Sequence, residues 1–158
     1  MPTFSQKSKD LLQDAHPHIE LVLNEAIKYI DFSIVTIHRG EEKQNELFEK
    51  GFSKVRYPKS KHNTKPSVAA DVAPYYKEYG ALFGGPEQIK RIMLQTGKNK
   101  DQVETFIIKA YARLIGILEG VALSNNIRLR VGLDWDGDFD TLDQTFHDLG
   151  HIELLDYD

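Results

Sequence analysis

The chain has 158 residues and no cysteine, 41% of its residues are hydrophobic, and its formal net charge is −4. The lack of cysteine excludes disulfides, thiolate catalysis and cysteine-ligated zinc, so histidine and carboxylate side chains must hold any metal ion. The length fits one domain over residues 1–158, the small net charge gives no reason to expect nucleic acid as a partner, and no apolar run approaches the roughly 18 residues of a membrane span.

The N-terminal third predicts helices, then a strand, then a further helix. Apolar residues at helical spacing over 8–30 indicate two short helices that are separated at Pro17. The β-rich run 32–37 predicts a strand, and the amphipathic segment 41–50 predicts a helix. Arg39 therefore follows a strand end, a place from which side chains often point into a site.

The middle of the chain predicts a loop, a strand and a helix. Segment 54–66 has the proline, serine, asparagine and lysine content of a loop. Segment 67–73 reads as a short buried strand that ends at Pro74. Pro86 at the start and Gly97 just past the end predict a helix between them.

The strongest helical pattern covers 101–125, where Asp101 and Glu104 resemble a capping box at the start. Two further strands are predicted at 129–133 and 151–155. Several helices mixed with short strands indicate the α+β class.

Charge is distributed unevenly along the chain. Between positions 51 and 70 there is no acidic residue but there are five basic ones: Lys54, Arg56, Lys59, Lys61 and Lys65. After Arg130 there are nine acidic residues and no lysine or arginine. One interpretation is a solvated loop and an acidic tail, and the other is an anionic ligand near the basic stretch and a cation site in the tail.

Candidate metal ligands follow from the histidines. Catalytic zinc commonly takes three ligands from histidine and carboxylate and keeps a fourth position for water. Of the six histidines, His16 and His18 flank a proline and are expected at the surface. His62 precedes Asp71 by nine positions, and His151 lies near the end of the chain.

Asp71 stands in an apolar strand, and burying a lone carboxylate is costly unless it is paired or bound to a metal. A metal site with His62 and His151 is one answer. The alternative is an ion pair with Lys59, Lys61 or Arg39, with His151 as a hydrogen-bonded core residue.

Three segments, in this order, resemble the zinc D-alanyl-D-alanine carboxypeptidase and L-alanyl-D-glutamate endopeptidase family: SKH at 60–62, AADVAPY at 69–75 and DLGHIEL at 148–154. The resemblance covers most of the chain and is greatest to the single-domain endopeptidases that bacteriophages use as endolysins. In the common family pattern the aspartate lies seven positions after the histidine, whereas in this chain Asp71 lies nine positions after His62.

The resemblance implies a small antiparallel sheet packed with several helices around a central zinc site. It implies one zinc ion per chain, held by His62, Asp71 and His151. It also implies that Asp148 is the catalytic carboxylate and that Arg39 is directed at the reacting carbonyl.

Two further residues are candidates for supporting the site. Ser60, two residues before His62, is a candidate for orienting a ligand or the substrate, and it is equally well a loop hydroxyl. Glu153 follows His151 by two residues on one strand, so both side chains should face the same side and Glu153 is placed to support a ligand.

The polar loop 134–148 contains a second candidate cation site. It spaces four carboxylates two residues apart, like the front of a calcium loop: Asp134, Asp136, Asp138 and Asp140. The alternative is an acidic solvated loop with Trp135 packed against the zinc site.

The sequence thus predicts an enzyme that hydrolyses the L-alanyl-D-glutamate bond of bacterial peptidoglycan stem peptides. The alternatives are a D-alanyl-D-alanine carboxypeptidase and a non-catalytic, zinc-stabilised peptidoglycan-binding module. With no apolar signal core at its N-terminus, a phage endolysin of this type would be made in the host cytoplasm and act on the cell wall, without membrane insertion and as a monomer.

Overall fold

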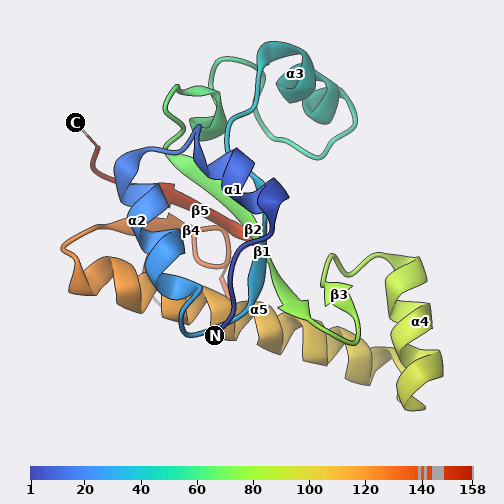
Figure 1. Ribbon diagram of the computed structural model, residues 1–158. Helices are drawn as coiled ribbons and strands as arrows, with labels where there is room; N and C mark the ends of the chain where they lie inside the picture. The colour runs from blue at the N-terminus through green and yellow to red at the C-terminus, as the bar shows by residue number, and fades with distance from the viewer. Residues whose placement is uncertain (139, 141, 144–147, 158) are drawn as a thin grey trace.

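The computed structural model describes residues 1–138, 140, 142–143 and 148–157. These residues form five α-helices and one small sheet (Figure 1). The helices, with one 3₁₀ turn, are α1 (Gln6–Leu12), α2 (Pro17–Ala26), α3 (Glu41–Glu49), η1 (Lys61–Asn63), α4 (Pro86–Thr96) and α5 (Lys100–Ser124). The strands are β1 (Phe32–Thr36), β2 (Ala69–Tyr76), β3 (Gly80–Ala81), β4 (Leu129–Val131) and β5 (His151–Leu154).

The sheet is antiparallel, in the order β1-β2-β5-β4, with β3 paired to the far end of β2. Helices and an antiparallel sheet together confirm the α+β class. Strand β5, the last in the chain, lies between β2 and β4, which places Asp71 opposite His151 and Arg130 opposite Glu153. Segments far apart in the sequence therefore meet at the centre of the sheet.

Side chains of the central strands alternate between two faces of the sheet. Ala70 and Val72 of β2, with Ile152 and Leu154 of β5, are almost fully buried in the main hydrophobic cluster. Helices α2 and α5 pack on each other and contact this sheet, and Leu114 contributes to the same cluster. The intervening residues of β2 and β5 face the other way, where polar groups gather.

Helix α5 runs along the base of the fold and reaches beyond the sheet to β3 and α4 (Figure 1). A second hydrophobic cluster forms there, with Leu82, Ile92 and Val103 in its interior. The start of α5 is capped by Asn99 and Gln102, two residues before the predicted pair at 101 and 104, because the helix begins at Lys100. No helix in the described part of the chain is long and apolar enough to cross a membrane.

The predicted end of the second strand at Pro74 is wrong. Strand β2 continues through Pro74, which lies opposite Phe32 at the edge of the pairing with β1. Proline has no N–H to donate, but the carbonyl of Pro74 accepts a hydrogen bond from the Leu82 amide at 2.8 Å. The residues after Pro74 pair with β3, a two-residue strand that the sequence did not predict.

Gly132 allows the chain before β5 to pass close to the end of β4. Its carbonyl accepts the Asp148 amide at 2.9 Å, and its amide donates to the His151 carbonyl at 2.8 Å. A Cβ atom at position 132 would lie 2.3 Å from the Asp148 carbonyl oxygen. Because that neighbour is backbone, only glycine fits without a shift of the segment that carries Asp148.

We therefore expect Gly132→Ala to destabilise the protein by about 1–3 kcal/mol through overpacking. Thermal unfolding measures this effect. The matched control is Gly120→Ala in α5, where an added Cβ meets nothing within 4 Å, and which should stabilise the helix by about 0.5–1 kcal/mol. Equal melting temperatures for the two variants would contradict the close approach at Gly132.

Candidate metal centre

His62 is held in place by the short turn η1. The Ser60 hydroxyl accepts a hydrogen bond from the His62 amide at 3.3 Å, and the Ser60 amide donates to the Asn63 side chain at 3.0 Å, so the two residues form a capping box. The His62 side chain is 2% exposed, and its Nδ1 lies 2.6 Å from the carbonyl oxygen of Ile37, just after β1. Ser60 thus fixes the turn that presents His62.

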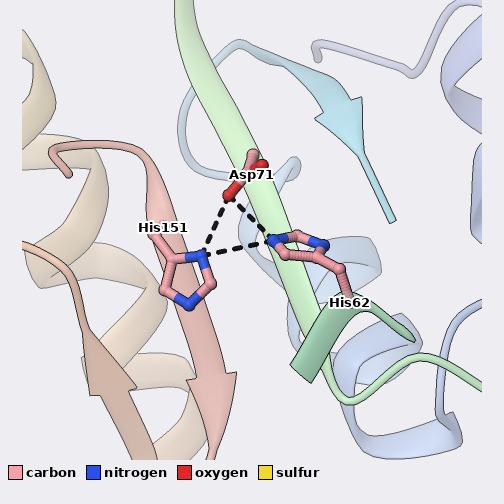
Figure 2. A group of neighbouring side chains, drawn as sticks. All are labelled: His62, Asp71 and His151. Carbon is pink, nitrogen blue, oxygen red and sulfur yellow. Dashed lines mark hydrogen bonds and ion pairs between the residues drawn. The ribbon is translucent and has the colours of Figure 1, made fainter. Parts of the chain in front are cut away.

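Asp71 and His151 reach the same point from neighbouring strands (Figure 2). Oδ1 of Asp71 lies 3.1 Å from Nε2 of His62 and 3.0 Å from Nδ1 of His151. The two ring nitrogens are 3.3 Å apart. These three side chains, from η1, β2 and β5, form a group that could hold a metal ion.

The other neighbours of the two rings determine which nitrogen carries a proton. The Ile37 carbonyl can only accept, so Nδ1 of His62 donates to it. Nε2 of His151 lies 3.0 Å from the Glu153 carboxylate and donates to that group. In neutral rings the remaining nitrogens then carry lone pairs, and both face the same oxygen of Asp71. Three lone pairs directed at one point are satisfied by a cation or by a shared proton.

Asp71 also forms an ion pair with Arg39, whose Nη2 lies 3.0 Å from Oδ2. The predicted alternative for Asp71 is therefore present together with the histidine contacts. Burial would raise the pKa of Asp71, but the hydrogen bonds and charges of His151 and His62 hold it well below its usual range. The carboxylate stays ionised, as a metal ligand must be.

Glu153 lies on the same face as His151, as the spacing predicts, and is hydrogen bonded to it. Nε of Arg130 donates to Glu153 at 2.8 Å, and Nη2 makes a second contact. Burial would raise the pKa of Glu153, but the bonds from His151 and Arg130 lower it. Burial would lower the pKa of His151, but the bonds to Asp71 and Glu153 raise it to about 9. A carboxylate behind a ligand histidine is a common device for orienting the ring.

A cleft of about 390 Å³ opens over two of the three converging side chains, His62 and His151. Asp148, Arg39 and Ser60 line it together with His62 and His151. Three lysines also line it: Lys54 and Lys59 from the loop after α3, and Lys61 from η1. Arg130 and Trp135 complete the lining near His151.

Asp148 precedes β5 in a tight turn, in which the His151 amide donates to its carbonyl oxygen at 3.0 Å. Burial, together with the charge of Asp71, raises the pKa of Asp148, although His151, His62 and Arg39 act in the opposite direction. A carboxylate in a cleft with a raised pKa is suited to accept and return a proton.

The acidic loop brings three of its four predicted carboxylates together. Asp134, Asp136 and Asp138 offer oxygen atoms within 4.8 Å of one another. Asp140 does not belong to this group. Asp136 and Asp138 are exposed, as acidic residues commonly are. Calcium binding stays a prediction.

The Trp135 ring lies 5.4 Å from the His151 ring, so Trp135 does pack beside the site. The rest of the predicted loop, 139, 141 and 144–147, lies outside the described residues.

Two polar residues of the site were missed by sequence analysis. Arg130 pairs with Glu153 only because β4 lies beside β5, and the distance along the chain gives no sign of that register. Gln44, on a helix whose other residues are exposed or half-buried, is fully buried and bonds to Arg39. A polar residue on a polar helix carries no signal of burial.

Comparisons with known proteins relate the chain by structure to solved proteins that include an enzyme. No family model matches the chain, and no curated protein matches it. The crystal structure of the Serratia marcescens L-Ala D-Glu endopeptidase ChiX superposes with a TM-score of 0.64, covering 96% of this chain and 88% of that chain at 19% sequence identity. The chain shares the fold of this endopeptidase. At that identity the likeness establishes the architecture, and the site must be argued from its own residues.

Proposed function

We propose that the chain is a zinc-dependent endopeptidase that hydrolyses the L-alanyl-D-glutamate bond of peptidoglycan stem peptides. The observation that carries the proposal is the convergence of three candidate ligand atoms, from His62, Asp71 and His151, beside a cleft that the two histidines line. The fold shared with an L-Ala D-Glu endopeptidase supports the class of substrate.

The donor set suits zinc. Two histidines and one carboxylate are among the ligand sets of catalytic zinc, and ligands 2.0–2.1 Å from a tetrahedral ion lie about 3.3 Å from one another. The three ligand atoms here are separated by 3.0, 3.1 and 3.3 Å. One zinc ion per chain is therefore part of the proposal, and when bound it would supply a Lewis acid that lowers the pKa of water.

The chain's own residues supply the proton transfer and the charge stabilisation. Asp148 accepts the proton of the attacking water and returns it to the leaving amine. Arg39 stabilises the negative charge that develops on the scissile carbonyl oxygen. A guanidinium has five N–H donors, more than its bonds to Asp71 and Gln44 use.

Charge in the cleft favours an acidic peptide. The three lysines and Arg130 place positive charge along the lining of the cleft. A stem peptide carries carboxylates next to the bond in question, so these cations would attract and orient it. This activity fits the role predicted from the sequence, that of a monomeric bacteriophage endolysin that acts on the cell wall.

The test combines metal analysis with lysis. We expect about one zinc per purified chain and loss of turbidity from outer-membrane-stripped bacterial cells, which a chelator abolishes. Bound zinc without clearing would instead favour a non-catalytic binding module. A chain that takes up no zinc would contradict both.

Zinc binding should release a proton near neutral pH. In the metal-free protein the raised pKa of His151, about 9, means that the ring is protonated at pH 7, whereas a ligand histidine must be neutral. The apparent zinc affinity should therefore rise about tenfold per pH unit up to about pH 9 and then level off. Calorimetry in two buffers of different ionisation enthalpy counts the protons, and a count of zero at pH 7 would contradict the pairing of His151.

A further inference from the structure

Gln44 is the one fully buried residue of α3. The helix and the loop after it project from one end of the sheet (Figure 1), and its other residues are exposed or half-buried. Gln44 itself is 0% exposed. Burying an amide is costly unless both its donors and its acceptor are satisfied, so the contacts of Gln44 indicate what it is there to hold.

The two ends of the Gln44 amide bind two different parts of the site. Its oxygen accepts hydrogen bonds from Nη1 of Arg39 at 3.1 Å and from the side-chain Nδ2 of Asn63 at 3.5 Å. Its nitrogen donates to the Ser53 hydroxyl at 2.8 Å and to the Val55 carbonyl at 2.6 Å. Residues 52–55, here called the wall segment, line the cleft over the converging ligands.

Arg39 is fixed at its backbone without the help of Gln44. Its amide donates to the His62 carbonyl at 2.8 Å, and its own carbonyl accepts from the Asn63 side chain at 2.7 Å. The guanidinium, at the end of a long side chain, is held by Asp71 on one nitrogen and by Gln44 on the other. Two planar contacts fix the rotation of a guanidinium, whereas one leaves it free to swing.

We propose that Gln44 is a positioning residue for the reaction: it aims the Arg39 guanidinium into the cleft and ties that orientation to the wall segment. This inference rests on the proposed function. A substrate that seats against the wall segment then meets an arginine already aimed at its carbonyl. A misplacement of about 1 Å in such a group can cost about 100-fold in rate.

The polarity of the amide separates this role from simple space filling. Gln44→Met keeps the volume of the side chain but removes the acceptor for Arg39 and the donors to the wall segment. Gln44→Glu keeps the acceptor and removes only the donors. If Gln44 acts through Arg39, the methionine variant should lose about 10- to 100-fold in kcat, and the glutamate variant should recover most of that loss while KM rises.

A double-mutant cycle with Arg39→Ala decides whether the effect passes through the arginine. Gln44→Met should lower kcat in the natural background but change it less than about twofold in Arg39→Ala. The matched control is Gln88→Met, since Gln88 ties the Phe83 and Gly84 amides to the Ala81 carbonyl far from the cleft. That control should lower the melting temperature and leave kcat unchanged.

A second readout does not depend on activity. In ¹H–¹⁵N spectra of the metal-free protein, the Arg39 Nη protons should give separate signals because rotation is hindered, and Gln44→Met should average them. If the methionine variant does not fold, Gln44→Asn serves in both tests, because its amide is one methylene too short to reach Arg39. Equal losses in both Arg39 backgrounds, or unchanged Arg39 signals, would overturn the inference. If the natural protein hydrolyses no peptidoglycan, the proposed function fails and the spectra alone decide the role of Gln44.

Discussion

Replacement of Asp148 by alanine is expected to lower the rate of peptide hydrolysis by about 10²- to 10⁴-fold, the usual contribution of a general base. Asp148 lines the cleft beside His62 and His151 but is not among the three converging ligands. The variant should therefore bind zinc with the stoichiometry of the natural protein. Single-turnover rates and metal analysis of the same preparation measure the two quantities.

The pH profile distinguishes a general base from a residue that only shapes the cleft. Asp148 works when ionised, and burial and the charge of Asp71 raise its pKa. As the pH is lowered, the rate of the natural protein should therefore start to fall at a pH above the range in which an ordinary aspartate titrates. Asp148→Asn should remove this limb along with most of the rate. Asp156→Asn, an exposed residue paired with Arg128, is the control that should change neither. Full activity in Asp148→Ala would contradict the assigned role.

Replacement of His151 by alanine is expected to abolish both zinc binding and hydrolysis. His151 supplies one of the three converging atoms, and structural zinc in zinc-finger peptides gains about 10–16 kcal/mol from its complete ligand set at pH 7. Losing one ligand should weaken the apparent affinity by on the order of 10³-fold. Competition with a chromophoric chelator measures the change.

The control for this variant is His18→Ala, which removes an exposed imidazole and should leave the zinc affinity as it was. The comparison with Asp148→Ala is informative: Asp148→Ala should lose hydrolysis but keep zinc, whereas His151→Ala should lose both. Stoichiometric zinc of undiminished affinity in His151→Ala would mean that the metal is held elsewhere.

The sequence predicts well those features that depend on local pattern. Helix α5 follows from its apolar periodicity, and the apolar run around Asp71 predicts the buried strand β2. The i, i+2 spacing of His151 and Glu153 correctly predicts that both face one side, and the structure adds the hydrogen bond between them.

Features that depend on register or on distant partners were not predictable. The bond of Arg130 to Glu153 requires β5 to insert between β2 and β4, which no local pattern specifies. Gln44 has partners from the end of β1 and from the loop after α3, and only the folded chain brings them together. The ion pair of Arg39 with Asp71, which the sequence offered as an alternative to a metal site, is present beside the contacts of Asp71 with both histidines.

The most direct test of the central claim is identification of the bond that is cut. Purified peptidoglycan digested by the zinc-loaded protein should yield new N-terminal D-glutamate groups, detectable by dinitrophenyl labelling and mass spectrometry, and a chelator should prevent their appearance. Release of free D-alanine without new D-glutamate termini would identify a carboxypeptidase instead. An unchanged peptidoglycan after digestion with the zinc-loaded protein would contradict the account.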